Sequence, residues 1–365
     1  MYRLLFDLVF RRIDPERAHD GTFALIRAVA AVPVLRDAVG AVLGPPPDAA
    51  FGLWGRSWPS RLGLAAGFDK EADGVLGTRM LGFGFVEVGT VTAVPQPGNE
   101  PPRLWRLLDQ RALRNRMGFN NQGAHAVAVR LRRLRATRRG RAAIVGVNIG
   151  KSRVTPLAEA PQDYATSARE LAPYADFLVV NVSSPNTPQL RDLQAVAALR
   201  PVLLAVRAAA DEATAVSGRA PVPLLVKIAP DLPDEDVDAV ADLVAELHLA
   251  GVVAVNTTIA HHEGPGGVSG PPLRARGLQV VARLRARLGA DAVIVGVGGI
   301  TTGGDARAYL AAGATVVEAY TGFIYEGPFF ARRITHVLGA ARPDGPALPD
   351  NEDGRALPDN LEQAG

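Results

Sequence analysis

Eight short apolar segments rich in β-branched residues are spaced along most of the chain. They begin at Arg61, Phe83, Ala142, Asp176, Val222, Gly251, Asp291 and Ala314. Ala-, Leu- and Arg-rich segments of helical length separate most of them, and this alternation is typical of parallel sheets with helices outside. The apolar positions run continuously, as strands covered on both faces require. We therefore predict an α/β fold, a (β/α)8 TIM barrel over about residues 60–340, with an open doubly wound sheet as the alternative.

Two connections are longer than a simple crossover needs. The interval from Gln96 to Arg141 predicts an inserted excursion after the second strand, and residues 185–191 predict another after the fourth. Barrels carry their chemistry on the loops that follow the carboxyl ends of their strands. We therefore expect functional residues in both excursions.

Residues 1–45 precede the barrel and contain two amphipathic helical patterns. The first includes Leu4 to Phe10, and the second opens at Asp14-Pro15-Glu16, a favourable helix start. These helices either dock on the barrel or lie in a bilayer interface. The segment from Gly44 to Asp48 predicts a stiff linker to a barrel domain at 46–340, and the Pro/Asp-rich residues 341–365 predict a disordered tail.

The composition excludes several kinds of chemistry. The chain has no Cys, which rules out disulfides, Cys-ligated zinc, iron–sulfur clusters and a thiolate nucleophile. The six His show no metal-binding spacing, so we expect no metal site, and the G-x-S-x-G motif of hydrolases is missing. A hydrophobic share of 48% is that of a globular enzyme.

Charge and hydropathy say less about partners. The net charge is +3, and the basic run from Arg130 to Arg141 is typical of a solvated helix, with nucleic acid or anionic lipid as the alternative partner. No apolar run reaches the ~18 residues of a spanning helix. The first apolar stretch is interrupted by Asp7 and lacks a convincing cleavage site, which predicts an intracellular protein that keeps its N-terminus.

Polar residues gather where the predicted strands end. They are Lys70, Thr90, Asn148, Asn181, Ser183, Lys227, Asn256 and Thr257. Polar groups inside a barrel cost several kcal/mol unless they have partners, so this ring indicates a site for a polar ligand. Lys227 is either a lysine that reaches water from a strand end or a fixed cation that faces developing negative charge.

Glycine-rich turns follow the seventh and eighth strands, at GVGGITTGG and YTGFIYEGP. Barrels commonly bind phosphate at these turns through backbone N–H groups. A dinucleotide fingerprint is the weaker interpretation, because Thr301 stands at its third glycine position. The turns therefore favour a phosphorylated cofactor or substrate.

Several longer motifs resemble one family. They are AAGFDK from Ala65, GTVTAVPQPGNEPPR from Gly89, NRMGFNNQG from Asn115, VNVSSPNTP from Val180, VKIAPDL from Val226, VNTT from Val255, GGVSGPPL from Gly266 and GVGGI from Gly296. In order and spacing the chain resembles dihydroorotate dehydrogenase over about residues 60–330. The resemblance implies an FMN-containing barrel that oxidises (S)-dihydroorotate to orotate in pyrimidine biosynthesis.

The same motifs imply a set of binding residues. FMN would be held by Ala65, Ala66, Gly67, Phe68, Asp69, Thr90, Asn148, Asn181, Lys227, Val255, Gly270, Gly299, Tyr320 and Thr321. Substrate would be held by Lys70, Asn115, Arg116, Met117, Gly118, Phe119, Asn181, Asn186, Asn256 and Thr257. The family often has Thr where Val255 stands, so a backbone contact is expected there.

The resemblance also implies catalytic roles. The reaction removes a proton from C5 and a hydride from C6, so a base and the flavin must lie on opposite faces of the substrate. Ser184 matches the family's base, and Thr187 or nearby Asn residues are candidates to assist it. Lys227 near the flavin would stabilise its anionic reduced form.

The Ser base and the N-terminal extension resemble the membrane-associated class 2 enzymes, which pass electrons to a quinone. His19 and Arg106 match positions that line the quinone tunnel. We therefore expect a monomer held peripherally on the cytoplasmic side of the cell membrane through residues 1–45, and no binding to nucleic acid. Two alternatives are an FMN barrel that reduces uracil, whose relatives use a Cys acid, and a non-catalytic binding protein, which intact Ser184 and Lys227 disfavour.

Overall fold

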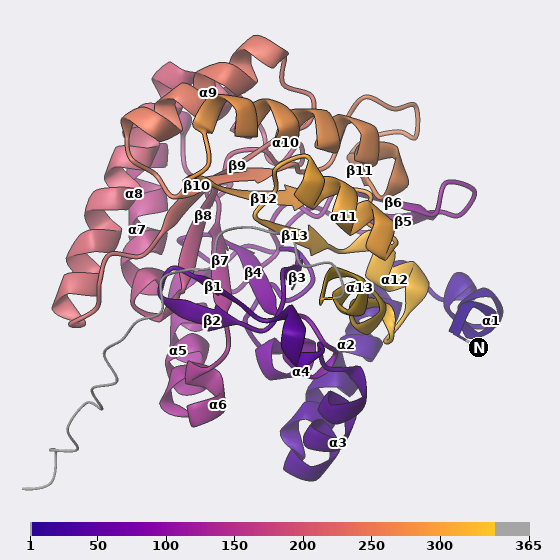
Figure 1. Cartoon of the computed structure of the whole chain (residues 1–365). Helices are drawn as coiled ribbons and strands as arrows, with labels where there is room; N and C mark the ends of the chain where they lie inside the picture. Colours follow the sequence, from indigo (N-terminus) through magenta and orange to yellow (C-terminus); the bar gives the residue numbers. More distant parts are fainter. Residues whose placement is uncertain (1, 340–365) are drawn as a thin grey trace, which may run out of the picture.

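The computed structural model describes residues 2–339, and its eight parallel strands close into a barrel (Figure 1). The strands are β3 (Leu62–Leu64), β4 (Phe85–Val91), β7 (Val145–Ile149), β8 (Phe177–Asn181), β9 (Leu224–Ile228), β10 (Gly251–Ala254), β12 (Val293–Val297) and β13 (Val316–Ala319). Each pairs with the next in this series, and β13 pairs with β3. The eight predicted segments are these strands, so the barrel prediction is confirmed and the open sheet is wrong.

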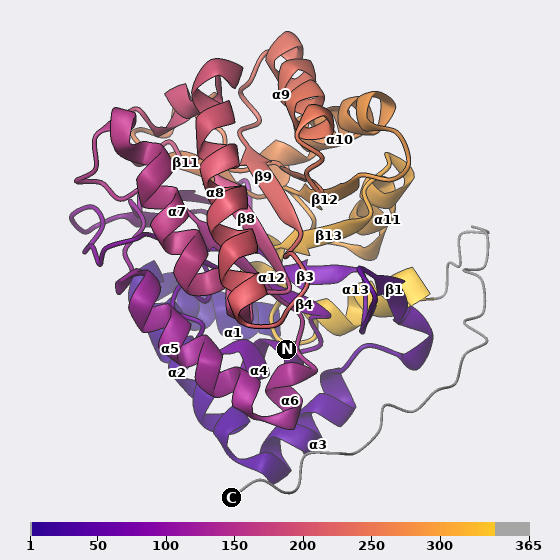
Figure 2. The ribbon, with the colours of Figure 1, turned by 90° about the vertical axis from the view of Figure 1, so that its left-hand side faces the viewer.

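Helices surround the barrel (Figure 2). They are α4 (Val75–Met80), α5 (Gly123–Ala136), α6 (Arg138–Arg141), α7 (Ala160–Leu171), α8 (Val196–Val216), α9 (Asp234–Glu246), α10 (Arg274–Leu288), α11 (Gly303–Ala311), α12 (Thr321–Glu326) and α13 (Phe330–Gly339). In α8, Leu199, Val202, Leu203 and Val206 are fully buried. Their spacing places them on one helical face, which packs on the barrel.

Short 3-10 helices join several of these elements. They are η1 (Phe10–Arg12), η2 (Pro47–Ala49), η3 (Leu157–Glu159), η4 (Ala172–Tyr174), η5 (Leu190–Gln194) and η6 (Pro271–Leu273). The predicted linker at Gly44–Asp48 leads into η2. The predicted disordered tail, residues 341–365, lies outside the described residues.

A small hairpin covers the amino-terminal end of the barrel. It consists of β1 (Phe51–Leu53) and β2 (Arg56–Trp58) in antiparallel pairing. The buried Trp58 ring packs on Phe85 and Phe177, which stand at the beginnings of β4 and β8, with ring centroids 4.9 and 5.9 Å away. This aromatic cluster fills that end, so it offers no room for a ligand.

The excursion after β4 forms a second small sheet. Its strands β5 (Leu104–Leu107) and β6 (Ala112–Asn115) are antiparallel, and β11 (Gly267–Ser269) pairs with β6. Within the predicted interval from Gln96 to Arg141, the inserted excursion is this sheet, and α5 and α6 follow it on the outside of the barrel. The sheet brings Asn115 toward the carboxyl ends of the barrel strands.

The N-terminal extension forms three helices where two were predicted. They are α1 (Tyr2–Leu8), α2 (Pro15–Ala31) and α3 (Pro33–Leu43). The second pattern corresponds to α2, and α3 is the additional helix, which begins at Pro33 because proline cannot continue α2. Asp14 caps α2 by accepting hydrogen bonds from the N–H groups of Glu16 and Arg17.

The helix α2 docks on the barrel domain. Ile26 and Ala30 are buried against α4, where a Cβ at Gly77 would lie 2.6 Å from Ile26 Cγ2. The glycine is therefore needed for the close approach of the two helices. Within residues 2–339, none of the helices combines the length and the apolar character needed to cross a bilayer.

Candidate active site

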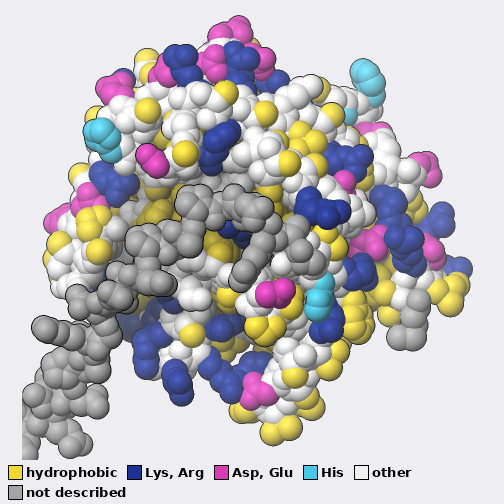
Figure 3. Space-filling model, in the orientation of Figure 1, with side chains coloured by type: hydrophobic (Ala, Val, Ile, Leu, Met, Phe, Trp, Pro, Cys, Tyr) yellow, Lys and Arg dark blue, Asp and Glu magenta, His cyan; other side chains and the backbone are white. Residues whose placement is uncertain are grey.

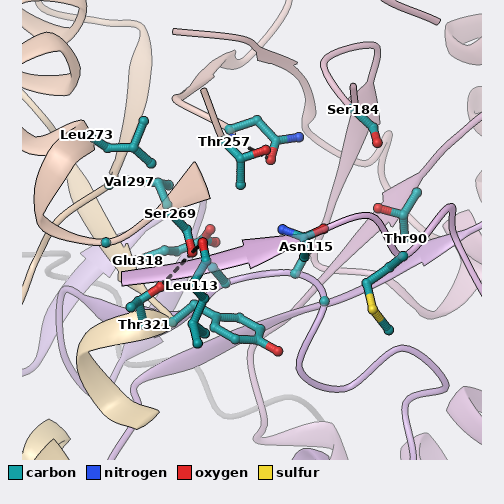
Figure 4. A pocket seen from close by; sticks show the side chains of 18 of the residues that line it. Thr90, Leu113, Asn115, Ser184, Thr257, Ser269, Leu273, Val297, Glu318 and Thr321 are labelled. Atoms are coloured by element: carbon teal, nitrogen blue, oxygen red, sulfur yellow. Dashed lines mark hydrogen bonds between the residues drawn. The ribbon is translucent and has the colours of Figure 1, made fainter. Parts of the chain in front are cut away.

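A cavity opens at the carboxyl ends of the barrel strands, with about 1280 Å³ of empty space when its mouth is included (Figure 4). Among the predicted site residues, those that line it are His19, Ala65, Ala66, Gly67, Lys70, Thr90, Asn115, Met117, Gly118, Phe119, Asn181, Ser184, Asn186, Lys227, Val255, Asn256, Thr257, Gly270, Gly299, Tyr320 and Thr321. Figure 4 shows Thr90, Asn115 and Ser184 toward one side of this cavity and Leu273, Val297 and Thr321 toward the other.

Three of the predicted binding residues lie behind the cavity wall. Phe68 packs its ring on His19 and Tyr320, with ring centroids 4.9 and 5.9 Å away. Asp69 caps the following turn by accepting the N–H groups of Asp73 and Gly74, and burial raises its pKa to about 6. Asn148 is fully buried and bonded to neighbouring side chains. These three residues therefore support the residues that line the cavity and do not line it themselves.

Two predicted arginines point away from the cavity. Arg116 donates to the carbonyl oxygens of Glu100 and Pro102. Arg106 donates to the Ile13 carbonyl at 2.7 Å and lies over the Phe6 ring. Arg106 therefore ties the β5–β6 sheet to the N-terminal extension, whereas His19 is the predicted tunnel residue that lines the cavity.

A network of amides and hydroxyls joins the ends of β4, β7 and β8. Asn181 Nδ2 donates to Thr90 Oγ1 at 3.0 Å and to Asn148 Oδ1 at 3.1 Å. Asn181 Oδ1 accepts from both the N–H and the hydroxyl of Ser183, and Ser183 Oγ accepts from Asn256. Because nearly every polar group in this network has a partner, the amides are held in fixed orientations.

The loop after β8 carries Ser184 into the cavity. Ser184 is 5% exposed, and its Oγ accepts the N–H of Asn186 at 3.2 Å. Asn186 Nδ2 donates to Asn115 Oδ1 at 3.1 Å, which links this loop to the β5–β6 sheet. Thr187 Oγ1 is buried without a hydrogen-bond partner among the described residues. Of the candidates to assist Ser184, Asn186 therefore contacts it and Thr187 does not.

Two buried glutamates accompany Lys227, and the sequence reasoning missed both. Lys227 Nζ lies 2.9 Å from Glu87 Oε1. Burial opposes the charge of Lys227, but Glu87 and Glu318 outweigh it and raise its pKa. Glu318 lines the cavity, and burial followed by the nearby Glu87 raises its pKa well above the ordinary value. Both glutamates stand inside apolar strand segments, which was the available signal.

Lys70 and His19 lie at the side of the cavity nearest the extension. Burial lowers the pKa of Lys70, although Glu16 and Asp20 oppose the shift. Burial, and next the charge of Lys70, lower the pKa of His19. A neutral His19 donates from Nε2 to the Phe68 carbonyl at 3.0 Å.

Glycines and a hydroxyl pair form the remaining wall. Gly67, Gly270 and Gly299 have φ of +103°, +100° and +69°, a conformation that other residues rarely adopt. Ser269 Oγ and Thr321 Oγ1 share a hydrogen bond of 2.8 Å, drawn in Figure 4. Lining residues that the sequence reasoning missed are Glu16, Leu104, Leu113, Pro185, Ser269, Leu273, Val297, Gly298, Ile300, Glu318, Ala319 and Gly322.

The fold and the site together define a class of protein. A parallel barrel with an amide-lined, lysine-containing cavity at the carboxyl ends of its strands, and glycine turns after the last two, is the arrangement of barrel enzymes that bind phosphorylated ligands. Within residues 2–339, we find no group of three or more His, Asp or Glu that could hold a metal ion.

Comparison with known proteins names the family. The model of the dihydroorotate dehydrogenase family matches residues 49–341. The chain is 55% identical to the dihydroorotate dehydrogenase (quinone) of Thermobifida fusca, covering 94% of each chain, and 55% identical to that of Kineococcus radiotolerans. A solved dihydroorotate dehydrogenase from Eimeria tenella, in complex with ferulenol, has a TM-score of 0.79 at 37% identity, covering 89% of this chain and 90% of that one. The chain belongs to the dihydroorotate dehydrogenase family and is an oxidoreductase.

Proposed function

We propose that this protein oxidises (S)-dihydroorotate to orotate in pyrimidine biosynthesis, with FMN as hydride acceptor and a quinone as final electron acceptor. The observation that carries the proposal is that Asn181 and Ser184, at the end of β8 and in the loop after it, and Lys227 of β9 line one cavity. The quinone-type relatives support the choice of acceptor.

The residues present fit FMN. A Cβ at Gly67 would meet only the Tyr320 ring, at 3.6 Å, so a side chain there would occupy space in the cavity. Among the described residues no backbone carbonyl accepts from the N–H of Gly299, which leaves this donor for a phosphate oxygen. Lys227 Nζ donates only to Glu87 Oε1 among the described residues, so its other N–H groups would be available to the ligand. FMN, when bound, supplies the ring that accepts the hydride.

Ser184 would take the proton from substrate C5. Its Oγ accepts a hydrogen bond from the Asn186 N–H, which favours the negatively charged form of the oxygen. It also lies in a loop that the Asn186–Asn115 contact fixes. The buried hydroxyl of Thr187, three residues on, is free to join a proton path once substrate is present.

Lys70 and the asparagines would orient the substrate. Among the described residues Lys70 forms no ion pair within 4.0 Å, and a carboxylate in the cavity would restore the charge that burial disfavours. Asn115, Asn186 and Asn256 present amide groups that can match the amide edges of a dihydropyrimidine ring.

The test is anaerobic. Purified protein should show a flavin absorption band that dihydroorotate bleaches and that a quinone analogue restores, whereas fumarate or NAD should not restore it. Ser184→Ala should keep the band but bleach about 10²–10⁴-fold more slowly, as loss of a general base predicts. Ser217→Ala, at an exposed position directly after α8, is the matched control. A protein without the band, or a band that substrate leaves unchanged, would contradict the proposal.

We also propose that the N-terminal extension holds the protein on a membrane surface, from which the quinone is drawn. Leu4 and Leu8 of α1 and Val34 of α3 are 63%, 53% and 77% exposed. Figure 3 shows hydrophobic side chains around α1 and α3, with basic side chains beside α3. Arg36, Arg79, Arg138 and Arg139 line a second hollow there together with Asp37, which pairs with Arg139, and the remaining excess of positive charge suits anionic lipid headgroups.

Vesicle sedimentation tests this placement. The protein should sediment with phosphatidylcholine vesicles that contain phosphatidylglycerol, and less with phosphatidylcholine alone. The double change Leu4→Ser and Leu8→Ser should release it and slow its reaction with a long-chain quinone. Leu204→Ser, an equally exposed leucine on α8, should have no effect. If the double variant sediments as the unchanged protein does, the extension is not the anchor.

A further inference from the structure

Three ionisable side chains meet inside the barrel below the cavity. They are Glu87 from β4, Lys227 from β9 and Glu318 from β13, and all three are at most 4% exposed. Glu318 also lines the cavity and is labelled in Figure 4. Among the described residues, Glu87 and Lys227 are the charged groups that face Glu318. The cluster therefore contains two carboxyl groups and one ammonium.

The hydrogen bonds of the cluster leave a gap on the carboxyl side. Glu87 Oε1 accepts from Lys227 Nζ at 2.9 Å and from Asn148 Nδ2 at 2.6 Å. Glu87 Oε2 and both oxygens of Glu318 are buried without a donor among the described residues. If both carboxyls were ionised, three buried oxygens would lack partners and the cluster would carry one uncompensated negative charge. Such an arrangement is costly in an interior of low dielectric.

One proton removes the excess charge and gives Glu87 Oε2 a donor. We propose that Glu87 and Glu318 share a single proton, carried by Glu318 and donated to Glu87 Oε2. Glu87 then remains the carboxylate that pairs with Lys227, and the cluster is electrically neutral. Two adjacent carboxyls with a common counter-ion favour this state, because the second ionisation must work against the first. Glu318 is thus a positioning residue that acts on Lys227 through Glu87.

The state of this pair matters for the cavity. A neutral Glu318 leaves the Lys227 ammonium as the charged group that this cluster presents to the cavity, whereas an ionised Glu318 would place a carboxylate on the cavity wall. This consequence for catalysis rests on the proposed function, in which Lys227 stabilises negative charge. The shared proton itself does not, so it can be tested whether or not the protein contains flavin.

Infrared spectroscopy on the full-length protein provides the first test. Glutamate labelled with ¹³C at the side-chain carboxyl separates its bands from those of aspartate and of flavin carbonyls. At pH 7 we expect one isotope-sensitive band of a protonated carboxyl, shifted in D₂O. Glu318→Gln should abolish it, and Glu212→Gln, an exposed change on α8, should not. Glu87→Gln should also abolish it, because Glu318 then becomes the sole counter-ion of Lys227.

The outcomes separate the alternatives. Absence of the band from the unchanged protein, or its survival in Glu318→Gln, would overturn the assignment of the proton. Survival in Glu87→Gln would show that Glu318 is protonated independently, which would overturn the sharing. If Glu87→Gln does not fold, Glu318→Gln still decides whether the proton is present, since its amide has the shape of the neutral acid.

The pH dependence of unfolding is the second test. The unfolded chain loses the Glu318 proton near the ordinary glutamate pKa, while the native protein keeps it, so stability falls as pH rises above that value. Glu318→Gln removes this dependence. Above about pH 5, the unfolding constant of the unchanged protein relative to the variant should therefore rise about tenfold per pH unit until native Glu318 ionises. A constant ratio between pH 5 and pH 8 would overturn the proposal.

Discussion

The hydroxyl of Tyr164 holds the end of β8, and its removal should damage both stability and the active site. Tyr164 lies on α7, is fully buried and donates to the Asn181 carbonyl at 2.7 Å. Asn181 is the residue whose side chain joins the ends of β4 and β7. Tyr164→Phe deletes one oxygen and keeps the ring, so packing changes little.

The loss of stability in Tyr164→Phe comes from the Asn181 carbonyl, which is left without its hydrogen bond. The Asn181 carbonyl at this point loses a buried hydrogen bond that water cannot replace, and a buried polar group left without its partner costs about 1–3 kcal/mol. The loss of stability should therefore be about 1–3 kcal/mol, and kcat/KM for dihydroorotate should fall several-fold because the Asn181 amide shifts. Urea unfolding should show a lower midpoint at an unchanged slope.

Tyr174→Phe is the matched control. Tyr174 follows α7 in the chain and is partly buried, and its hydroxyl makes no hydrogen bond with the described residues. It should change stability by less than about 0.5 kcal/mol, as substitutions away from such contacts do. If Tyr164→Phe and Tyr174→Phe behaved alike in unfolding and in kinetics, the hydroxyl would not hold the strand end and the reasoning would be wrong.

Three further predictions concern other parts of the molecule. Arg103 binds Glu16 through Nε and Nη2 at 2.7–3.1 Å, so Arg103→Lys should lose the two-point contact and speed proteolysis within residues 1–45. Trp58→Ala should cost about 3–5 kcal/mol in thermal or urea unfolding and leave the KM for dihydroorotate unchanged, because the ring fills the end remote from the cavity. Asp69 has its pKa raised from 3.8 to about 6, so its protonated form is favoured on folding. Its contribution to stability should fall by about 2 kcal/mol between pH 4 and pH 6, which the pH dependence of unfolding of Asp69→Asn against the unchanged protein measures.

The hydrophobic pattern was enough to find the barrel, since all eight strands are largely apolar segments that carry few polar residues. Local signals for smaller elements were weaker. The hairpin β1–β2 and the β5–β6–β11 sheet consist of three- and four-residue strands with mixed burial, so no period could show them. The helix α3 was missed, although Pro33 at its first position was an available signal for a helix start.

Most cavity-lining residues were predicted because they lie in motifs or at strand ends. The residues that were missed depend on contacts distant in the chain. Glu318 follows two valines in β13, and only closure of the barrel brings it beside Glu87 and Lys227. Likewise, Leu104 and Leu113 reach the cavity because the small sheet folds over the barrel. In the opposite direction, Arg106 and Arg116 lie in or beside the matching motifs, but their guanidinium groups bind backbone carbonyls.

The aromatic cluster around Trp58 also determines where ligands can enter and leave the barrel. Because the Trp58 cluster fills the amino-terminal end of the barrel, a ligand must enter and leave the cavity at the carboxyl ends of the strands. On one side the cavity is lined by Glu16 and His19 of α2, and on another by Ser184 and Asn186 of the loop after β8. Two different ligands can therefore be separated by the part of this entrance that each one uses, or by the order in which they bind. They cannot be separated by entering from opposite ends of the barrel.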